Sequence, residues 1–289
     1  MFNLMTQGDL SLIQKALNKW RSEGFIPLLQ SAKWYIPYKV ARKSRIFVGE
    51  RQFEIYTNAR YRIQKIISSA PADPWRPIDI DPSDVQYKAK PCKSQWGLGR
   101  IKGGDWDAPE NLRPLEEHRI VKGLRQRYID DLDWSDTVYV KEVKRKFDIG
   151  KGQRNYQTLN EFLEVRCAFV DDLYESIKMD GYRPNFAAEH VSPDIDHRND
   201  PRNSHHRLEP LVAIGRDGEI YWRDGFHRLT IAQILGINSI PVNVIARHQR
   251  WQEIRDEIDA AQDPSELNSE IQRYLSHPDL TGIVPESWL

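Results

Sequence analysis

The sequence predicts an α+β protein with a small mixed sheet, packed helices, a large insertion and a helical extension at the amino end. Three observations predict this class. Residues 210–215 and 219–223 have the pattern of two strands joined by Arg216-Asp217-Gly218, and an Asp-Gly pair is a strong hairpin signal. A helical pattern follows at 226–235 and a further strand at 240–246. Amphipathic helical patterns precede all of these segments.

Composition limits the possible classes of protein. The chain has 289 residues, of which 39% are hydrophobic and 29% charged, as in ordinary globular proteins. Lys and Arg equal Asp and Glu at 42 each, so no global field would attract nucleic acid, which is therefore not favoured as a partner. Cys92 and Cys167 lie far apart and predict neither a disulfide framework nor a CxxC metal site.

The chain also lacks membrane and export signals. No basic segment followed by a long apolar run occurs near Met1, and no stretch of about 18 apolar residues exists. We therefore expect a cytoplasmic protein without a membrane partner.

Residues 1–72 are expected to form the helical extension. Apolar residues recur at helical spacing over 9–23 and again over 50–70. The segment Pro71-Ala72-Asp73-Pro74 breaks the second helix and marks a boundary.

Residues 73–250 are expected to form the sheet domain, with the insertion at about 90–150. Residues 77–88 predict a strand, a Pro82 turn and a second short strand, and 91–110 predict a loop held by tryptophan. A helix with a basic face is expected over 112–130, and a short strand over 137–140.

The last third of the chain contains the clearest helical pattern, at 157–180. Gly181 stands where a helix end favours positive φ. Residues 189–207 are polar and rich in histidine, which predicts a loop. Residues 251–289 are expected to form a helical tail.

The motif Asp224-Gly225-Phe226-His227-Arg228 lies where the second hairpin strand meets the next helix. The first amides of a helix lack internal partners, so that end attracts phosphate, and glycine lets the backbone approach closely. Arg228 adds a planar donor fork and His227 can move a proton near neutral pH. Asp224 could orient His227 or bind Mg²⁺. The five residues fit equally well a second interpretation, in which Asp224 merely caps the helix.

The residues around this motif resemble the ParB/sulfiredoxin superfamily over roughly 160–250. The matching segments are Leu211-Val212-Ala213-Ile214, Asp217-Gly218, residues 221–229, Ala232, Leu235-Gly236 and Ile240-Pro241-Val242. The Asp-Gly-x-His-Arg form is closer to the free-serine kinase and sulfiredoxin branches than to chromosome-partitioning ParB. Sulfiredoxin has a reactive cysteine where this loop has Phe226, so sulfinic-acid reduction is not expected.

The resemblance implies that the loop binds nucleotide phosphates through Gly225, Phe226, His227 and Arg228. It implies ATP or another nucleotide with Mg²⁺ as cofactor, and phosphoryl transfer to a small hydroxylated acceptor. His227 and Asp224 are the catalytic candidates, together with Glu209 as a guess for the base. Two alternatives remain open at this point: a nucleotide-gated binding or scaffold protein without turnover, and a ParB-like DNA-binding protein or nuclease.

Three other groups of residues are weighed as possible binding sites. Gly103-Gly104-Asp105-Trp106-Asp107 is better explained as a turn pinned by Trp106 than as a second wall of the site. The histidines and aspartates of 190–206 match no zinc signature. The basic residues of 113–127 and 141–146 alternate with acids, which favours a solvated surface over a nucleic-acid interface.

Overall fold

The computed structural model describes residues 50–289, apart from 93–96, 154, 186–192 and 194–207. The chain divides into two units between residues 51 and 52, and the sheet belongs to the second. The predicted helix at 9–23 and almost all of the predicted loop at 189–207, with its four histidines, lie outside the described residues.

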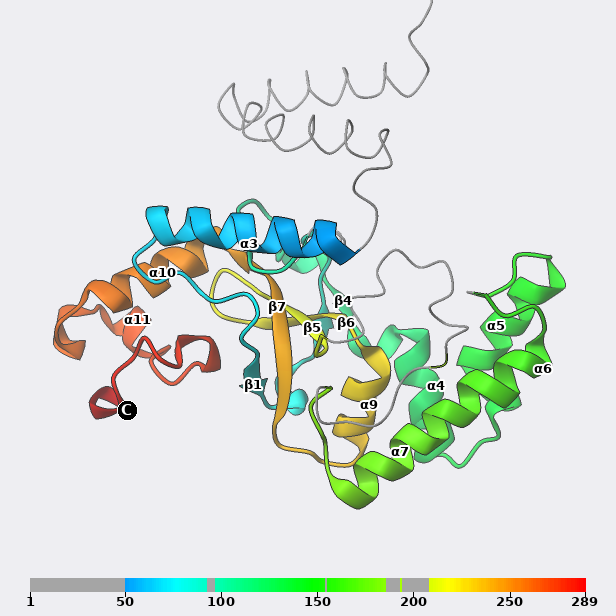
Figure 1. The fold of residues 1–289 in the computed structure, drawn as a ribbon. Coiled ribbons are helices and arrows are strands. Elements are labelled where there is room, and N and C mark those ends of the chain that lie inside the picture. Colours follow the sequence, from blue (N-terminus) through cyan, green and yellow to red (C-terminus); the bar gives the residue numbers. More distant parts are fainter. Residues whose placement is uncertain (1–49, 93–96, 154, 186–192, 194–207) are drawn as a thin grey trace, which may run out of the picture. The chain divides into compact units, whose positions relative to one another are not determined.

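A mixed sheet forms the centre of this second unit (Figure 1). The strand order is β1-β7-β5-β6-β2-β4, and β3 pairs with β7. Neighbours are parallel at β7–β5, β6–β2 and β3–β7, and antiparallel elsewhere, which confirms the predicted α+β class with a mixed sheet. The strands are β1 (Ile78–Ile80), β2 (Tyr87–Lys88), β3 (Arg100–Lys102), β4 (Arg113–Pro114), β5 (Leu211–Ile214), β6 (Ile220–Asp224) and β7 (Ile240–His248).

The helices fall into two groups. Figure 1 shows α4, α7 and α9 together, away from α10 and α11. The longer helices are α3 (Glu50–Ile67), α4 (Arg119–Tyr128), α5 (Val138–Asp148), α7 (Ala168–Asp180), α9 (Phe226–Ile234) and α10 (Gln249–Ala260), and the short ones are α6 (Leu159–Glu161) and α11 (Ser269–Gln272). Among the described residues, none of the helices is long and apolar enough to cross a membrane.

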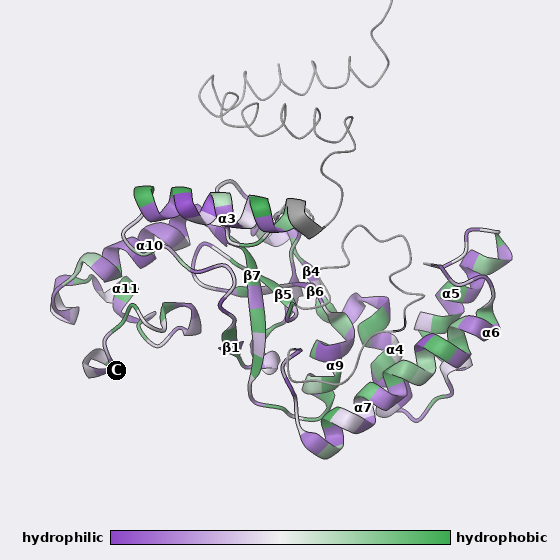
Figure 2. Cartoon of the chain, in the orientation of Figure 1, coloured by the Kyte–Doolittle hydropathy of each residue, from purple (hydrophilic) through white to green (hydrophobic). Residues whose placement is uncertain are grey.

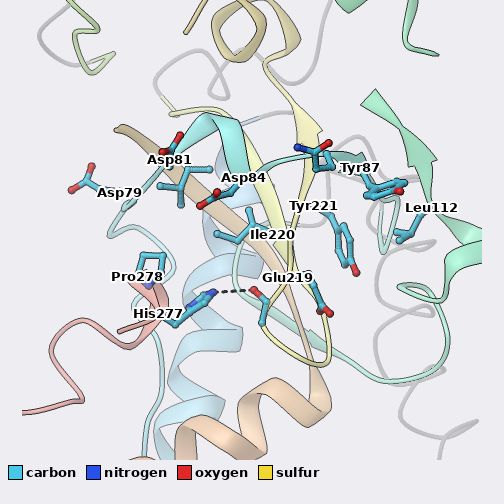
Figure 3. Close-up of a pocket in the computed structure, with 13 residues that line it drawn as sticks. Asp79, Asp81, Asp84, Tyr87, Leu112, Glu219, Ile220, Tyr221, His277 and Pro278 are labelled. Carbon is cyan, nitrogen blue, oxygen red and sulfur yellow. Dashed lines mark hydrogen bonds between the residues drawn. The ribbon is translucent and has the colours of Figure 1, made fainter. Parts of the chain in front are cut away.

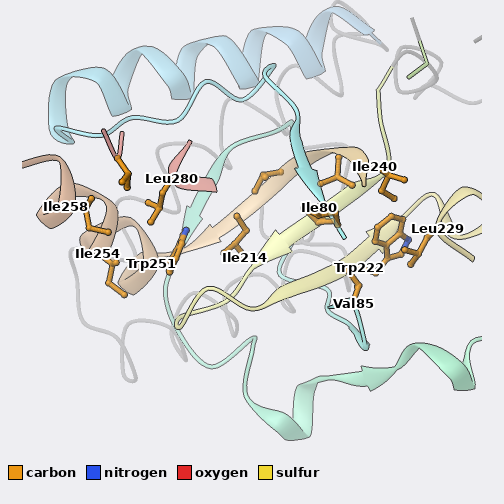
Figure 4. Close-up of a cluster of buried hydrophobic side chains, with 14 of the residues drawn as sticks. Ile80, Val85, Ile214, Trp222, Leu229, Ile240, Trp251, Ile254, Ile258 and Leu280 are labelled. Carbon is orange, nitrogen blue, oxygen red and sulfur yellow. The ribbon is translucent and has the colours of Figure 1, made fainter. Parts of the chain in front are cut away.

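The hairpin β5–β6 lies in the middle of the sheet, between β7 and β2, and both faces of β5 are covered. All four residues of β5 are buried, so the strand is a continuous apolar run. Val212 and Ile214 pack into one core with Trp222, whereas Leu211 and Ala213 face a second core. Figure 4 shows the first core between the sheet and the helices. In Figure 2, β7 is largely hydrophobic while α10 is mostly polar.

The chain forms a third core outside the sheet, among α4, α5, α7 and the segment before α7. Its centre holds Tyr139 and Phe162, and Ile231 of α9 joins it to the sheet. The long helix predicted at 157–180 is confirmed, although residues Phe162–Cys167 form a π-turn between α6 and α7. Gly181 ends it at φ +77°, as predicted.

Two predictions, the type of one element and the start of another, are wrong. Residues 137–140 are not a strand: Thr137 caps α5 by accepting a hydrogen bond from the Val140 amide, and buried Val143 continues the helical spacing. The helix predicted from residue 112 begins only at Arg119, because β4 and a 3-10 turn precede it.

Residues 90–150 contribute directly to the sheet domain. They supply β3 and β4, and α4 packs against α9. Trp106 pins the glycine-rich turn as predicted, since its indole nitrogen donates to the Lys102 carbonyl at 3.0 Å. Asp107 is buried and accepts hydrogen bonds from the amide and guanidinium of Arg216, so it holds this turn against the β5–β6 hairpin.

Candidate phosphate site at two helix amino ends

Gly225 joins β6 to α9 in a conformation that requires glycine. Its φ of +85° is left-handed, and a Cβ there would lie 2.8 Å from the Cβ of Pro210. The interpretation of Asp224 as a helix cap is not supported, because no side chain caps α9. Asp224 Oδ1 instead accepts from the neighbouring Gly225 amide at 2.9 Å, and Asp224 is exposed.

A second uncapped helix end lies beside the first. His118 precedes α4 without capping it, and its ring stacks on Phe226 at 3.9 Å between centroids and 14° between planes. The helical hydrogen bonds begin with Lys122 N to His118 O in α4, and with Leu229 N to Gly225 O in α9. The earlier amides of both helices therefore contribute partial positive charge to one place.

Basic side chains surround this junction. Lys88 of β2 has its ammonium 6.0 Å from the Phe226 ring centroid. Burial lowers the pKa of Lys88, and the positive charges of Lys90, Arg113 and Arg119 lower it further against an opposing effect of Glu117. The neighbouring positive charges that add to this effect of burial would stabilise an anion placed beside them.

The same field acts on His118. Burial lowers its pKa to about 4, assisted by Lys88 and Arg119, so the imidazole is neutral at pH 7. His118 Nδ1 and Arg119 Nε are buried without a hydrogen-bond partner within the described parts of the chain. Buried polar atoms without partners are costly, so these two nitrogens favour an added ligand that can pair with them.

His227 lies deeper than the sequence suggests. It is 8% exposed, and its Nδ1 lies 3.1 Å from Nη2 of buried Arg166 in the π-turn. A guanidinium can only donate, so Nδ1 accepts and the proton of the neutral imidazole resides on Nε2. Its ring packs at 5.9 Å from that of Tyr139. His227 therefore links α9 to the helical core.

Arg228 and Glu209 are brought together, although the sequence predicted different roles for them. Arg228 Nη1 lies 3.2 Å from Glu209 Oε2 and 2.6 Å from Asn185 Oδ1, and Nη2 donates to the Leu208 carbonyl. Burial raises the pKa of Glu209, while Arg228 opposes that rise. The guanidinium predicted to hold phosphate is thus engaged in an internal ion pair, and direct phosphate contact would require this pair to open.

The basic residues Lys88, His118, Arg119 and Arg166 were not predicted as site residues. Arg119 belongs to a run of basic residues interpreted as a solvated face, and Arg119, Arg127 and Lys144 of that run do form ion pairs with acidic residues. Arg119 itself pairs through Nη1 with Glu142, and the packing of α4 against α9 brings it to the junction of the two helix ends.

Magnesium would have to be held mainly by the nucleotide. The described parts of the chain contain no group of three or more His, Cys, Asp or Glu residues placed to hold a metal ion. Mg²⁺ commonly uses one or two carboxylates together with substrate phosphates. Exposed Asp224, beside the start of α9, is the carboxylate that could supply such a contact.

Comparison of the chain with protein-family models, with curated proteins and with solved structures finds no match. The resemblance to the ParB/sulfiredoxin superfamily therefore stays a prediction based on the motif around Gly225.

We expect inorganic pyrophosphate to raise the pKa of His118 from about 4, because a nearby anion favours the imidazolium. Without ligand, the pKa of His118 is about 6.5 in the unfolded chain and lower in the folded one. Between these two values the unfolded chain binds a proton that the folded chain does not, so the free energy of unfolding falls as the pH drops through this range. NMR titration of the histidine rings with and without pyrophosphate measures the pKa, and urea denaturation at several pH values measures the stability. His277, bonded to Gly218 in another part of the fold, is the internal control. An unresponsive His118 contradicts the site.

Proposed function

We propose that the chain binds the phosphate groups of a nucleotide where the amino ends of α4 and α9 meet. One observation carries this proposal: the uncapped starts of α4 and α9 meet where His118 stacks on Phe226, beside Lys88, and His118 Nδ1 and Arg119 Nε are buried there without a partner in the described structure. The positive left-handed φ of Gly225 supports it, because the turn leaves the first amides of α9 without a capping side chain.

The phosphate contacts in this proposal differ from those expected from the motif alone. The amides of α9 and α4, Lys88 and Arg119 Nε contact the anion, while Arg119 Nη1 stays paired with Glu142. Gly225 and Phe226 shape the approach. His227 and Arg228 act as positioning residues, through Arg166 and Glu209 respectively. The resemblance in sequence supports a nucleotide rather than a simple anion.

We extend the proposal to phosphoryl transfer onto a small hydroxylated acceptor. In that step the acceptor oxygen forms a bond to the terminal phosphorus, the bridging P–O bond breaks, and the nucleoside diphosphate leaves. Glu209, whose pKa is raised by burial, takes the proton of the hydroxyl. Bound Mg²⁺ would neutralise charge on the phosphate oxygens.

Replacing Lys88 with methionine is expected to weaken ATP binding about 10- to 100-fold, since hydrogen bonds to charged groups contribute about 1.5–3 kcal/mol. Isothermal titration with ATP, ADP and CTP, with and without Mg²⁺, measures the effect. Lys178→Met, at an exposed position of α7, is the matched control and should bind as the parent chain does. Equal affinity of Lys88→Met and the parent chain would remove the site assignment.

Turnover is tested separately with labelled nucleotide and a panel of hydroxylated acceptors. We expect Glu209→Gln to retain nucleotide binding and to lose product formation at least about 100-fold, within the range of general-base catalysis. A parent chain that binds nucleotide but releases no product supports binding without turnover and contradicts the transferase proposal alone.

A further inference from the structure

A cavity of about 580 Å³ lies beside the β5–β6 hairpin, away from the α9 motif on β6. Figure 3 shows its walls: the segment of β1 and the following 3-10 turn on one side, and the start of β6 with His277 and Pro278 on the other. A cavity of this size falls within the range that accommodates small organic ligands.

The cavity opens onto an unpaired stretch of strand edge. β2 pairs with β6 only at Lys88 and Trp222, where the Ala89 amide donates to the Trp222 carbonyl. Backbone groups of a strand alternate in direction, so those of Ile220, two residues earlier, point to the same side. Ile220 lines the cavity, and no described strand pairs with it on that side. Its carbonyl is therefore an acceptor available to a ligand.

The walls carry an excess of negative charge. Asp79, Asp81, Asp84 and Glu219 line the cavity, and none of them forms an ion pair with any described residue. Two of the four already accept a hydrogen bond: Asp81 Oδ1 from the Ser83 amide at 2.8 Å, and Glu219 Oε2 from the Asp217 amide at 3.3 Å. Carboxylates gathered without a counter-charge repel one another, so a cation bound among them is stabilised.

Two tyrosines add features that a simple acidic surface lacks. Tyr221 is only 7% exposed and lines the cavity, yet its hydroxyl has no hydrogen-bond partner in the described structure. Figure 3 shows this hydroxyl at the end of the ring nearer Glu219. Tyr87 is 44% exposed, and a tyrosine face attracts ammonium groups. The aliphatic side chains of Ile80 and Ile220 provide an apolar wall.

We propose that this cavity binds a linear polyamine, meaning a molecule with two or more ammonium groups separated by methylene chains. The ammonium groups donate hydrogen bonds to the carboxylates, to the Ile220 carbonyl and to the Tyr221 hydroxyl. The methylene chains between them cover the two isoleucines. A metal ion fits poorly, because in the described parts of the chain no three ligands are placed to hold one. A nucleotide would be repelled by the carboxylates.

Titration of the full chain with spermidine, at an ionic strength of about 0.15 M to screen distant charges, tests the proposal. Glu219→Gln and Asp84→Asn should each weaken binding about three- to tenfold, and Tyr221→Phe by a similar factor. Glu164→Gln and Asp172→Asn, exposed acids in the π-turn and α7, are the charge-matched controls and should leave affinity unchanged. Circular dichroism checks that each variant folds.

Butylamine and calcium chloride distinguish specific recognition from general attraction of cations. Spermidine should bind at least tenfold more tightly than either of them. The proposal is overturned by equal affinity for calcium or butylamine, by equal weakening in the control variants, or by no spermidine binding at about 1 mM. None of these results bears on the nucleotide site, because the variants leave Lys88 and the two helix ends unchanged.

Discussion

Replacing Asp279 with asparagine is expected to lower the free energy of unfolding by about 3–5 kcal/mol, because it removes one partner of a buried ion-pair network. Asp279 Oδ1 lies 2.5 Å from Arg247 Nη2, and Oδ2 accepts from Arg255 Nη1 and from Trp251 Nε1, both at 2.9 Å. Both arginines are buried, so the substitution leaves two guanidinium groups without their counter-charge. The C-terminal tail is held to β7 and α10 by this network.

Urea denaturation monitored by tryptophan fluorescence measures the loss, and Asp259→Asn on the exposed side of α10 is the control. The two arginines hold the pKa of Asp279 well below its usual range. A depressed pKa contributes stability above the unfolded value of about 4, and this contribution is lost as the pH falls toward the folded value. The variant should therefore lose part of the acid dependence of stability. A loss below about 1 kcal/mol would contradict this account of the tail.

Replacing Gly225 with alanine is expected to destabilise the fold by about 2–4 kcal/mol and to weaken nucleotide binding. A left-handed φ costs a residue with a side chain about 1–2 kcal/mol. The added Cβ would also lie 2.8 Å from the Cβ of Pro210, and such overpacking typically costs about 1–3 kcal/mol. Relief of this contact must move the start of α9, which displaces the amides proposed to hold phosphate.

Gly236→Ala separates these two causes. Gly236 also has a positive φ, of +66°, but a Cβ there would have no heavy atom within 4 Å. It should therefore lose only the backbone contribution, about 1 kcal/mol, and bind nucleotide normally. Thermal denaturation and ATP titration of both variants supply the comparison. Equal losses of stability in the two variants would show that the contact with Pro210 does not matter.

Local signals predicted the parts of the fold that depend on neighbours in sequence. The Asp217-Gly218 turn, the glycine that opens α9 and the glycine that ends α7 all occur where expected. The strand predicted for Thr137-Val138-Tyr139-Val140 is wrong because the prediction relied on the preference of β-branched and aromatic residues for strands. The burial of Tyr139, Val140 and Val143 in the helical core outweighs that preference.

The arrangement of the candidate site depends on contacts that no local pattern reveals. Arg166 reaches His227 from a π-turn, and Glu209, just before β5, meets Arg228 at the start of α9. The stacking of His118 on Phe226 joins two segments about a hundred residues apart in sequence. A motif can identify residue types suited to phosphate, but only tertiary packing decides which of them remain available.

The zero net charge conceals two opposite local fields. Lys88, Arg119 and two helix amino ends lie at one end of β2, whereas the cavity beyond Tyr87 is lined by Asp84 and Glu219. The opposite charges of these regions cancel in the net charge of the whole sequence. Opposite fields this near to each other are what the two proposed sites, one for an anion and one for a cation, require.

The most direct measurement of the central claim is the chemical-shift response of backbone amides to ATP in a ¹⁵N NMR titration. We predict the largest shifts at the first amides of α9 and α4, namely those of Phe226, Arg228, Arg119 and Ile120, together with Ala89 beside Lys88. The amides of α10 should not respond. Saturable ATP binding that shifts α10 or the tail while leaving the first turns of α4 and α9 unchanged would contradict the proposed phosphate site.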